Sequence, residues 1–395
     1  MHRSSTVPKD RFGSGPGRQI TDNRAAVQLQ AVSRSRLSTD ESFVLLYFTG
    51  SLYMKYTSQV EKKMEKQRRK EMKKIVKTLS AMVLICTVAL YSGMAAAQSY
   101  PTKPVRLIIP FPPGGSNDIV GRFIATKLTE RLGKQVVADN RGGAGGVIGT
   151  EAAAKSEPDG HTLLVISSAY AINTSLYKVP YDPVKAFTPV AKLGTGPNVF
   201  AVHPGVPVNS VKEFIALAKE KPGQLNFAAA GVGSFQHLGT ELFKSMAGVD
   251  VSIVQFKGGG PAMIDLIGGH MHATLGSLIQ FMPHIKSGKV KALGTGGAKR
   301  SVSLPDVPTI AEAGVAGYEA NNWWGILAPA GTPRPIIDRL YKEISAILGA
   351  AETQKVFGDQ GAEVDKLGPA EFGPYIAAET AKWGKVIREA NIKAE

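Results

Sequence analysis

Two glycine-rich segments of the sequence have the residue types of loops that bind anions. Residues 110–118 read Pro-Phe-Pro-Pro-Gly-Gly-Ser-Asn-Asp, and residues 228–234 read Ala-Ala-Ala-Gly-Val-Gly-Ser. Each is expected to lead from a strand into a helix, where glycines let the backbone approach a ligand and the first helical N–H groups point toward it. One such loop in each of two lobes would hold a small molecule with an anionic group at each end.

Side chains in and near these loops offer further donors. Ser116, Asn117 and Ser234 carry hydroxyl or amide groups, and His237 follows Ser234 by three residues. His237 is interpreted as a donor in the pocket or just behind its lining, and the alternative is a histidine packed between helix and sheet. Asp118 is best explained by the helix dipole, since an acid in the first turn stabilises any helix. For each loop alone, an ordinary strand-to-helix turn with capping residues is the alternative.

No cofactor, metal or catalytic site is convincing. Segment 139–149 follows a predicted strand, but a Gly-x-Gly-x-x-Gly pattern begun at Gly143 meets Ile148 at its last position. His270 and His272 share one face of a strand, yet nothing secures the three or four ligands that zinc requires. No Gly-x-Ser-x-Gly motif occurs, and no carboxylate pair is evident. We therefore expect no cofactor, no metal and no catalysis.

Residues 72–97 have the pattern of a secretory signal peptide. Lysines at 73, 74 and 77 precede an apolar run that ends in three alanines, which predicts cleavage after Ala97. The run from 79 to 93 is shorter than the roughly 20 residues of a membrane span. The mature chain is therefore expected in the periplasm.

Charge and cysteine content narrow the possible partners. Of the formal net charge of +15, residues 1–97 carry +10 and the remaining 298 residues only +5. A mildly basic mature chain helps gather small anions but does not indicate a nucleic-acid partner. The single cysteine, Cys86, lies in the signal, which leaves the mature chain without a thiol. A lipid anchor at Cys86 is disfavoured because Ile85, which precedes it, is not small.

Residues 1–71 lie ahead of the signal, which is unusual for an exported protein. They are rich in Arg, Ser and Gly at first, followed by an apolar patch at 43–48 and a basic run at 62–74. We interpret them as an extension from a start codon placed too far upstream, with Met64 or Met72 as the true start, and expect disorder there. A functional tail is the alternative.

The 298 residues after Ala97 predict two α/β lobes with largely parallel sheets. Their number exceeds what one core usually serves, and short apolar strands alternate with amphipathic helices. Strands are expected at 105–110, 135–139, 162–167, 199–202, 225–229, 251–256, 272–276 and 290–295. Helices are expected from 116 or 117 to 132, at 148–155, from the capping box Ser210–Glu213 to before Pro222, from a second capping box at Thr309–Glu312, and at 336–348, 353–360 and 369–390.

A series of motifs in fixed order carries a family resemblance. They include Pro110-Phe-Pro-Pro-Gly-Gly-x-x-Asp118, Asp139-Asn-Arg-x-Gly-Ala-Gly-Gly146, Gly231-Val-Gly-Ser-x-x-His-Leu238, Phe256-Lys-Gly-Gly-Gly-Pro-Ala262 and Ala328-Pro-Ala-Gly-Thr-Pro333. Over about 290 residues the chain resembles the Bug family, also called TctC-like proteins, the extracytoplasmic solute receptors of tripartite tricarboxylate transporters.

The resemblance implies a type II periplasmic-binding-protein fold, in which two α/β lobes close on a ligand. Lobe 1 would comprise residues 98–198 plus 322–395, and lobe 2 residues 199–321, with crossings near Asn198 and Trp323. Ligands of the family are typically carboxylates. The loops matching 111–118 and 229–237 would contact them from opposite lobes.

Departures from the family pattern bear on the ligand. Gly142 stands where Pro is common, and Phe256 where Tyr is common. An acid near Ser277 is absent, which favours a plain organic acid over a ligand with an amine. Lys257 is either a positive charge at the rim or solvated surface. The predicted ligand-binding residues are Phe111, Gly114, Gly115, Ser116, Asn117, Asp118, Ser168, Ala230, Gly231, Val232, Gly233, Ser234, His237, Phe256 and Lys257.

The predicted function is a periplasmic receptor that captures a small carboxylate, acts as a monomer and delivers its ligand to the membrane permease subunits of a tripartite tricarboxylate transporter. One alternative is a secreted α/β hydrolase or transferase with an unrecognised site. Another is a sensory accessory subunit, which would share the pocket and differ in its docking surface.

Overall fold

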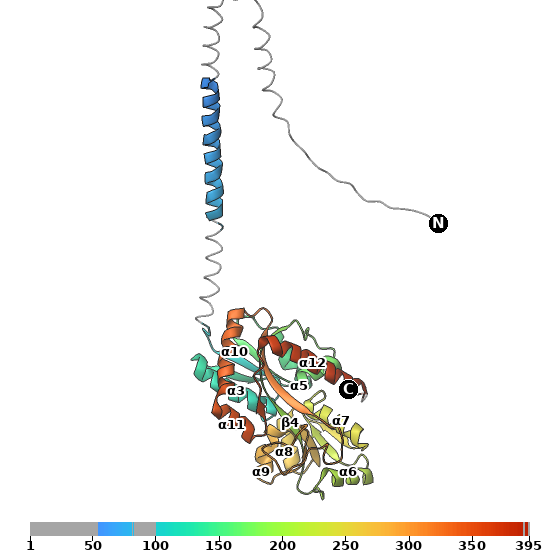
Figure 1. Ribbon diagram of the computed structural model, residues 1–395. Helices are drawn as coiled ribbons and strands as arrows, with labels where there is room; N and C mark the ends of the chain where they lie inside the picture. Colours follow the sequence, from blue (N-terminus) through green and yellow to red (C-terminus); the bar gives the residue numbers. More distant parts are fainter. Residues whose placement is uncertain (1–53, 81, 83–99, 390–391, 394–395) are drawn as a thin grey trace, which may run out of the picture. The chain divides into compact units, whose positions relative to one another are not determined.

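The computed structural model describes residues 54–80, 82, 100–389 and 392–393. The chain divides into two units, residues 1–89 and 90–395. Figure 1 shows the ribbon of both units. Among the described helices, none combines the length and apolar character needed to cross a membrane.

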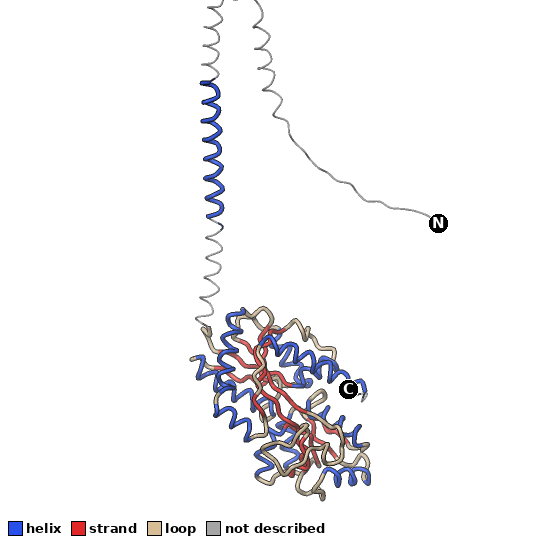
Figure 2. Tube along the Cα trace, in the orientation of Figure 1, coloured by secondary structure: helices blue, strands red, loops and turns tan. Residues whose placement is uncertain are grey.

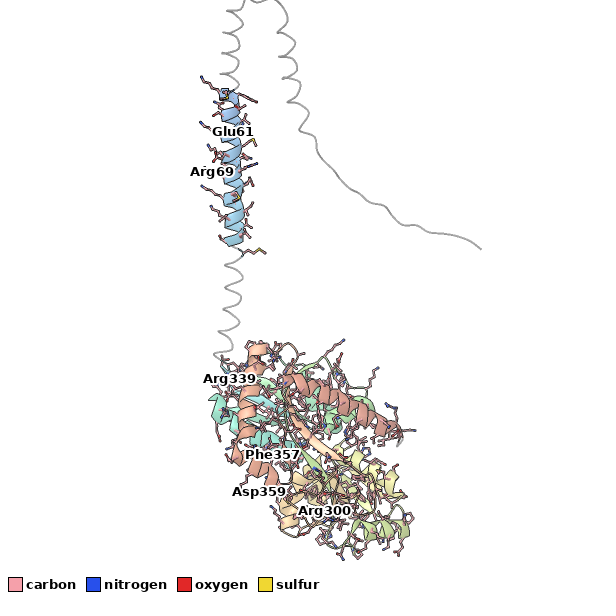
Figure 3. All side chains as sticks on the ribbon, in the orientation of Figure 1. Glu61, Arg69, Arg300, Arg339, Phe357 and Asp359 are labelled. Atoms are coloured by element: carbon pink, nitrogen blue, oxygen red, sulfur yellow. The ribbon has the colours of Figure 1, made fainter. Side chains whose placement is uncertain are left out.

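The first unit contains a helix over residues 54–80, which includes part of the segment for which disorder was predicted, and that interpretation stays a prediction. Its exposed side chains, which include Glu61 and Arg69, surround it on all sides (Figure 3). Arg69 pairs with Glu65 at 2.7 Å, four residues away, and such pairs of good helix formers support an isolated helix. The predicted signal peptide overlaps the end of this helix. Residues 1–53 and 83–97, with Cys86 and the predicted cleavage site, lie outside the described residues.

Within the second unit, the described strands form one ten-stranded mixed sheet. Its order is β2-β1-β3-β9-β4-β7-β5-β6, and β8 and β10 also pair with β4. Figure 2 shows the strands as a band flanked by helices. The strands are β1 (Val105–Ile109), β2 (Val136–Asn140), β3 (Thr162–Ser167), β4 (Phe187–Val202), β5 (Asn226–Ala229), β6 (Ser252–Gln255), β7 (Ala273–Ser277), β8 (Lys291–Thr295), β9 (Asn321–Pro329) and β10 (Glu363–Val364).

Helices alternate with strands through most of this unit, and its last three helices have only the two-residue strand β10 among them. The α-helices are α3 (Ser116–Leu132), α4 (Val147–Ala154), α5 (Ser168–Leu176), α6 (Val211–Glu220), α7 (Phe235–Ala247), α8 (Gly259–Ile267), α9 (Leu278–Lys286), α10 (Arg334–Gly349), α11 (Ala351–Asp359) and α12 (Pro369–Glu389). A short 3-10 helix, Ala144–Gly146, lies directly before α4.

Strand β4 joins two lobes because it changes its neighbours along its length. Residues 187–197 pair with β9, whereas residues 198–202 pair with β7. We call the part built on β1–β3, β9, β10 and the first part of β4 lobe 1, and the part built on β5–β8 and the end of β4 lobe 2. The chain therefore has the two-lobe α/β fold that was predicted. The predicted residue boundaries of the lobes stay a prediction.

The predicted parallel pairing is correct only at the two flanks of the sheet. β1 pairs in parallel with β2 and β3, and β5 with β6 and β7. In the centre, β4 and β9 are antiparallel to their neighbours. Trp323 and Trp324 lie in β9 and are fully buried, so the chain becomes helical only after that strand. Continuous burial hides the strand period that would have indicated β9.

The two predicted capping boxes behave differently. Ser210 accepts a hydrogen bond from the Glu213 N–H at 3.1 Å and opens α6 as expected. Thr309 accepts from the Glu312 N–H at 3.0 Å, and Glu312 accepts from the Thr309 N–H at 2.9 Å. Residues 310–314 nevertheless form a turn and no helix. Gly314, with a φ of 116°, leaves the helical conformation there.

An aromatic cluster holds the core of lobe 2 beneath its ligand-facing loop. The Phe200 ring lies 4.8 Å from that of Phe214, 5.0 Å from that of Phe243 and 5.5 Å from that of Phe227. Phe227 is in β5 and Phe243 in α7, the two elements that the second glycine-rich loop connects. Packing of these rings fixes that loop at both ends.

Candidate functional site

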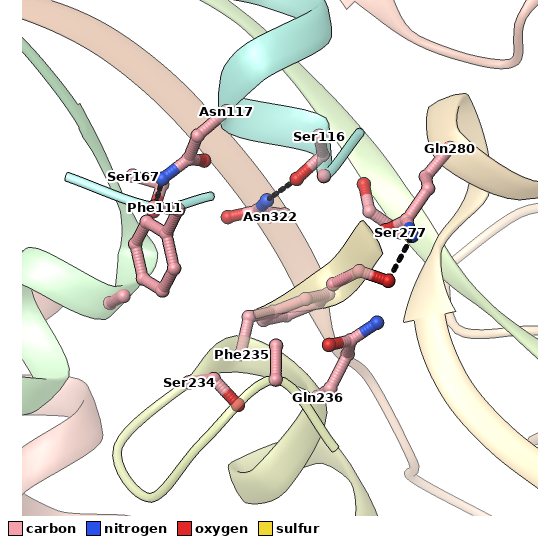
Figure 4. Close-up of a pocket in the computed structure, with 14 residues that line it drawn as sticks. Phe111, Ser116, Asn117, Ser167, Ser234, Phe235, Gln236, Ser277, Gln280 and Asn322 are labelled. Carbon is pink, nitrogen blue, oxygen red and sulfur yellow. Dashed lines mark hydrogen bonds between the residues drawn. The ribbon is translucent and has the colours of Figure 1, made fainter. Parts of the chain in front are cut away.

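A pocket with an uncharged lining lies between the two lobes (Figure 4). It encloses about 410 Å³ of empty space, including the part open to solvent. Lobe 1 contributes Phe111, Gly115, Ser116, Asn117, Ser167, Ala169 and Asn322, and lobe 2 contributes Ala230, Ser234, Phe235, Gln236, Gly259, Ser277 and Gln280. None of these residues carries a formal charge, so any charge selectivity must come from hydrogen-bond donors and backbone dipoles.

Five helices begin at this pocket. The residues that cap the N-termini of α3, α5, α7 and α9 line it, and Gly259, the first residue of α8, lines it too. The first N–H groups of a helix have no partner inside the helix, and they carry partial positive charge. Five helix N-termini therefore create a positive potential in a pocket without a cationic side chain. That arrangement suits an anion with several acceptor atoms.

The first glycine-rich loop is held in place by Asp118, which lies behind the pocket. The Asp118 carboxylate accepts hydrogen bonds from the Gly114 N–H at 3.0 Å, from Arg122 Nε at 2.8 Å and from Asn140 Nδ2 at 2.8 Å. Its side chain is buried. Gly114 has a φ of 84°, a conformation that favours glycine. Asp118 thus positions the loop and is not part of the lining.

Asn322 on β9 ties the start of α5 to the start of α3. Its Oδ1 accepts from the Ser168 hydroxyl at 2.6 Å and from the Ser168 N–H at 3.3 Å. Its Nδ2 donates to Ser116 Oγ at 3.5 Å. The Ser168 side chain is fully buried and bonded to Asn322, and it does not line the pocket.

The second glycine-rich loop reaches the pocket through Ala230 and Ser234. Ser234 caps α7 and accepts a hydrogen bond from the His237 N–H at 3.2 Å. The residues between Ala230 and Ser234 contact lobe 1 instead. Val232 O accepts a hydrogen bond from the Tyr177 hydroxyl at 3.1 Å. A Cβ on Gly233 would lie 2.3 Å from Asn173 Oδ1. This loop therefore serves both as lining and as a contact between the lobes.

His237 lies beneath the second loop and does not line the pocket. Its Nδ1 accepts from the Gly233 N–H at 3.4 Å, and its side chain is buried. Burial, with a smaller contribution from Lys244, lowers the pKa of His237 from 6.5 to about 4. The neutral ring at pH 7 supports the loop through this hydrogen bond.

We expect the His237→Asn variant to lose less stability in acid than the unchanged protein. The unfolded chain takes up the proton near pH 6.5 and the folded chain only near pH 4, so the stabilisation is present above pH 6.5 and is lost as pH falls toward 4. A shift of this size corresponds to at most about 3 kcal/mol. Asparagine keeps an acceptor for the Gly233 N–H. Urea unfolding at pH 4 to 8 measures the difference, and parallel pH profiles of the two proteins would contradict the assignment.

Of the predicted ligand-binding residues, Phe111, Gly115, Ser116, Asn117, Ala230 and Ser234 line the pocket. The others do not: Gly114, Asp118, Ser168, Gly231, Val232, Gly233 and His237 shape the loops or support them, and Phe256 and Lys257 precede α8. Lys257 is exposed. Ligand contact stays a prediction for the whole set. In the described part of the chain, no group of three or more His, Cys, Asp or Glu residues is arranged to hold a metal.

Several lining residues were not among those predicted. They are Ser167, Ala169, Phe235, Gln236, Gly259, Ser277, Gln280 and Asn322. One signal was available, because Gly258-Gly259-Gly260 follows a predicted strand as the other two glycine-rich segments do. Ser277 was noted from the sequence only as a position near which an acidic residue is common in the family. Asn322 lies in the strand that the sequence did not indicate.

Comparison with known proteins gives a consistent result. Residues 120–392 match the sequence pattern of the family described as tripartite tricarboxylate transporter family receptor. The protein BugT of Bordetella pertussis is 37% identical over 322 residues, which are 81% of this chain and 99% of BugT. The structure of R. palustris Rpa4515 with adipate superimposes with a TM-score of 0.73 at 37% identity, and it covers 74% of this chain and 99% of that one. MatC from Rhodopseudomonas palustris with bound malate gives a TM-score of 0.70 at 32% identity, with coverage of 73% and 100%.

Proposed function

The chain belongs to the tripartite tricarboxylate transporter family of receptors, and on this premise we propose that it captures a small organic acid between its two lobes and delivers it to a membrane permease. The observation that carries the proposal is the meeting of five helix N-termini at a pocket without charged side chains. Relatives whose structures hold adipate and malate support a carboxylate as the ligand.

A carboxylate fits such a pocket for physical reasons. Its two oxygens accept several hydrogen bonds, and hydrogen bonds to an ionised group are stronger than neutral ones. Backbone N–H groups and the Ser116, Asn117 and Ser234 side chains supply donors from both lobes. An ammonium group would meet positive helix ends and no acid. We therefore propose an anionic, amine-free ligand.

Contacts between the lobes at the loops next to the pocket support a receptor that encloses its ligand. The Tyr177 hydroxyl of lobe 1 donates to Val232 O of lobe 2. Pro113 of lobe 1 faces Gly260 of lobe 2 so closely that a Cβ on Gly260 would lie 2.2 Å from the Pro113 oxygen. Away from the pocket, Lys286 Nζ donates to the backbone oxygen of Asp359 at 3.1 Å.

The lining favours binding over catalysis. It has no carboxylate, histidine, lysine or thiol that could act as a general base or an ionised nucleophile. The relatives are solute-binding receptors, which disfavours the hydrolase or transferase alternative. A sensory accessory subunit would use the same pocket, and loss of uptake on deletion of the permease would separate the two roles. We further propose that the mature protein begins after Ala97, lies in the periplasm and acts as a monomer.

We expect organic acids to raise the unfolding temperature of the purified protein after unfolding and refolding have stripped any carried-over ligand. A ligand at 100 times its dissociation constant stabilises by about 2.7 kcal/mol, which for a chain of this size is a shift of roughly 5–11 °C. The panel pairs each acid with its uncharged amide, for example succinate with succinamide. A shift with the acid and none with the amide supports the proposal. Equal shifts would contradict the anion site, and no shift with any acid would contradict the carboxylate ligand.

A further inference from the structure

Two buried polar atoms of the pocket have no hydrogen-bond partner. They are Gln236 Oε1 and Ser277 Oγ, on residues that are 5% and 3% exposed. The other side-chain amides of the lining have hydrogen-bond partners within the protein. Asn117 Nδ2 donates to Ser167 Oγ, and Gln280 Nε2 donates to Gly259 O at 2.6 Å. Asn322 Oδ1 accepts from the Ser168 hydroxyl. A buried polar group without a partner is costly, so two of them in one pocket point to a ligand group that completes them.

Both atoms belong to lobe 2 and to neighbouring elements. Gln236 is the second residue of α7, and Ser277 ends β7 and caps α9. Gln236 Nε2 lies 3.1 Å from the position that a Cβ on Gly276 would occupy, so this amide rests against the strand residue that precedes Ser277. Figure 4 shows Gln236, Ser277 and Gln280 gathered on one side of the pocket, with Asn117 and Ser167 on the opposite side.

The chemistry of the unpartnered atoms restricts the group that faces them. An amide oxygen only accepts, while a serine hydroxyl both donates and accepts. A second carboxylate only accepts and would leave Gln236 Oε1 without a donor. An ammonium group donates, but no acid lines the pocket to balance its charge. A hydroxyl group donates to Gln236 Oε1 and accepts from Ser277 Oγ, so it satisfies both.

We propose that Gln236 and Ser277 form a hydroxyl-reading corner, and that the preferred ligands are hydroxycarboxylates. This inference rests on the proposed function, because the carboxylate would bind at the helix N-termini and place the hydroxyl in the corner. It adds a selectivity that helix N-termini alone do not provide.

The test compares acids that differ by one hydroxyl group. Calorimetry on the purified, ligand-stripped protein measures both enantiomers of malate against succinate, and citrate against tricarballylate. We expect a hydroxylated acid to bind about ten- to a hundredfold more tightly than its deoxy partner, since the deoxy acid leaves both atoms unpaired. In Ser277→Ala and in Gln236→Met the ratio falls severalfold, while the affinity for the deoxy acid is unchanged or higher. Ser167→Ala, a matched serine in the lobe 1 lining, lowers both affinities alike.

The outcomes separate the two proposals. Equal affinities for hydroxylated and deoxy acids in the unchanged protein would overturn the hydroxyl-reading corner and leave the carboxylate receptor standing. A preference that survives in both variants would also overturn it. Absence of binding by every acid would overturn both proposals. The comparison in the unchanged protein decides the matter even where a variant fails to fold.

Discussion

Replacing Gly260 with alanine is expected to weaken ligand binding ten- to a hundredfold while both lobes stay folded. The new Cβ would lie 2.2 Å from the Pro113 backbone oxygen, on the opposite side of the cleft. A backbone oxygen cannot rotate away as a side chain does, so the lobes must part to relieve the contact. Overpacking of this kind costs about 1–3 kcal/mol. The cost falls on the state in which the lobes touch, and the ligand must overcome it to bind.

Calorimetry with an acid that binds the unchanged protein measures the effect, and thermal unfolding checks the fold. Gly260 has no positive φ, so alanine fits the local helix once the lobes separate. Gly358→Ala is the matched control, because nothing lies within 4 Å of its added Cβ in α11. It should leave affinity unchanged. Unchanged affinity in Gly260→Ala as well would mean that binding does not need the close approach of Pro113 and Gly260.

Replacing Asp118 with alanine is expected to lower the free energy of unfolding by about 3 kcal/mol and to weaken binding as well. The substitution removes the acceptor for the Gly114 N–H, Arg122 Nε and Asn140 Nδ2 together. Loss of one partner from a buried charged network costs about 3–5 kcal/mol, and the half-exposed Arg122 places this case at the lower end. The loop that carries Ser116 and Asn117 then loses its anchor.

Urea unfolding gives the stability change, and calorimetry gives the affinity change. Asp338→Ala is the control, because Asp338 also pairs with an arginine four residues away on a helix, at 2.8 Å, but is exposed. Exposed pairs of this kind contribute less than about 1 kcal/mol. A loss in Asp118→Ala no larger than in Asp338→Ala would show that the three hydrogen bonds do not hold the loop.

Local signals predicted the elements at the flanks of the sheet well. β3 was expected at 162–167 and lies there, and α3 ends at Leu132, where Gly133 adopts a φ of 66°. Both have a local cause, a bounded apolar run in one case and a capping glycine in the other. Strands β4 and β9, which connect the two lobes, gave no such signal. Residues 187–197 contain Pro189, Gly194 and Gly196, which indicate a loop in isolation, yet pairing with β9 makes them a strand.

The same distinction holds for the pocket. Ser116 and Ser234 were predicted because glycines and caps mark a helix N-terminus in the sequence. Gln236, Ser277 and Asn322 come from three separate elements, and only the tertiary arrangement brings them to one place. Asp118 shows that a local interpretation can also keep a residue out of the pocket. The sequence explained this acid best by the helix dipole, and in the structure it is not part of the lining.

The place of β9 between β3 and β4 also governs the order in which the chain can fold. Until residues 321–329 have been made, β3 and β4 each present an unpaired edge, and a contact between such distant segments forms slowly. The strands of lobe 2 lie close together in sequence and can pair first. Once lobe 2 has folded, the chain enters it from β4 and leaves it into β9 at neighbouring points, so β9 comes to lie beside β4. The aromatic cluster around Phe200, which holds the core of lobe 2, therefore also bears on when lobe 1 can complete its sheet.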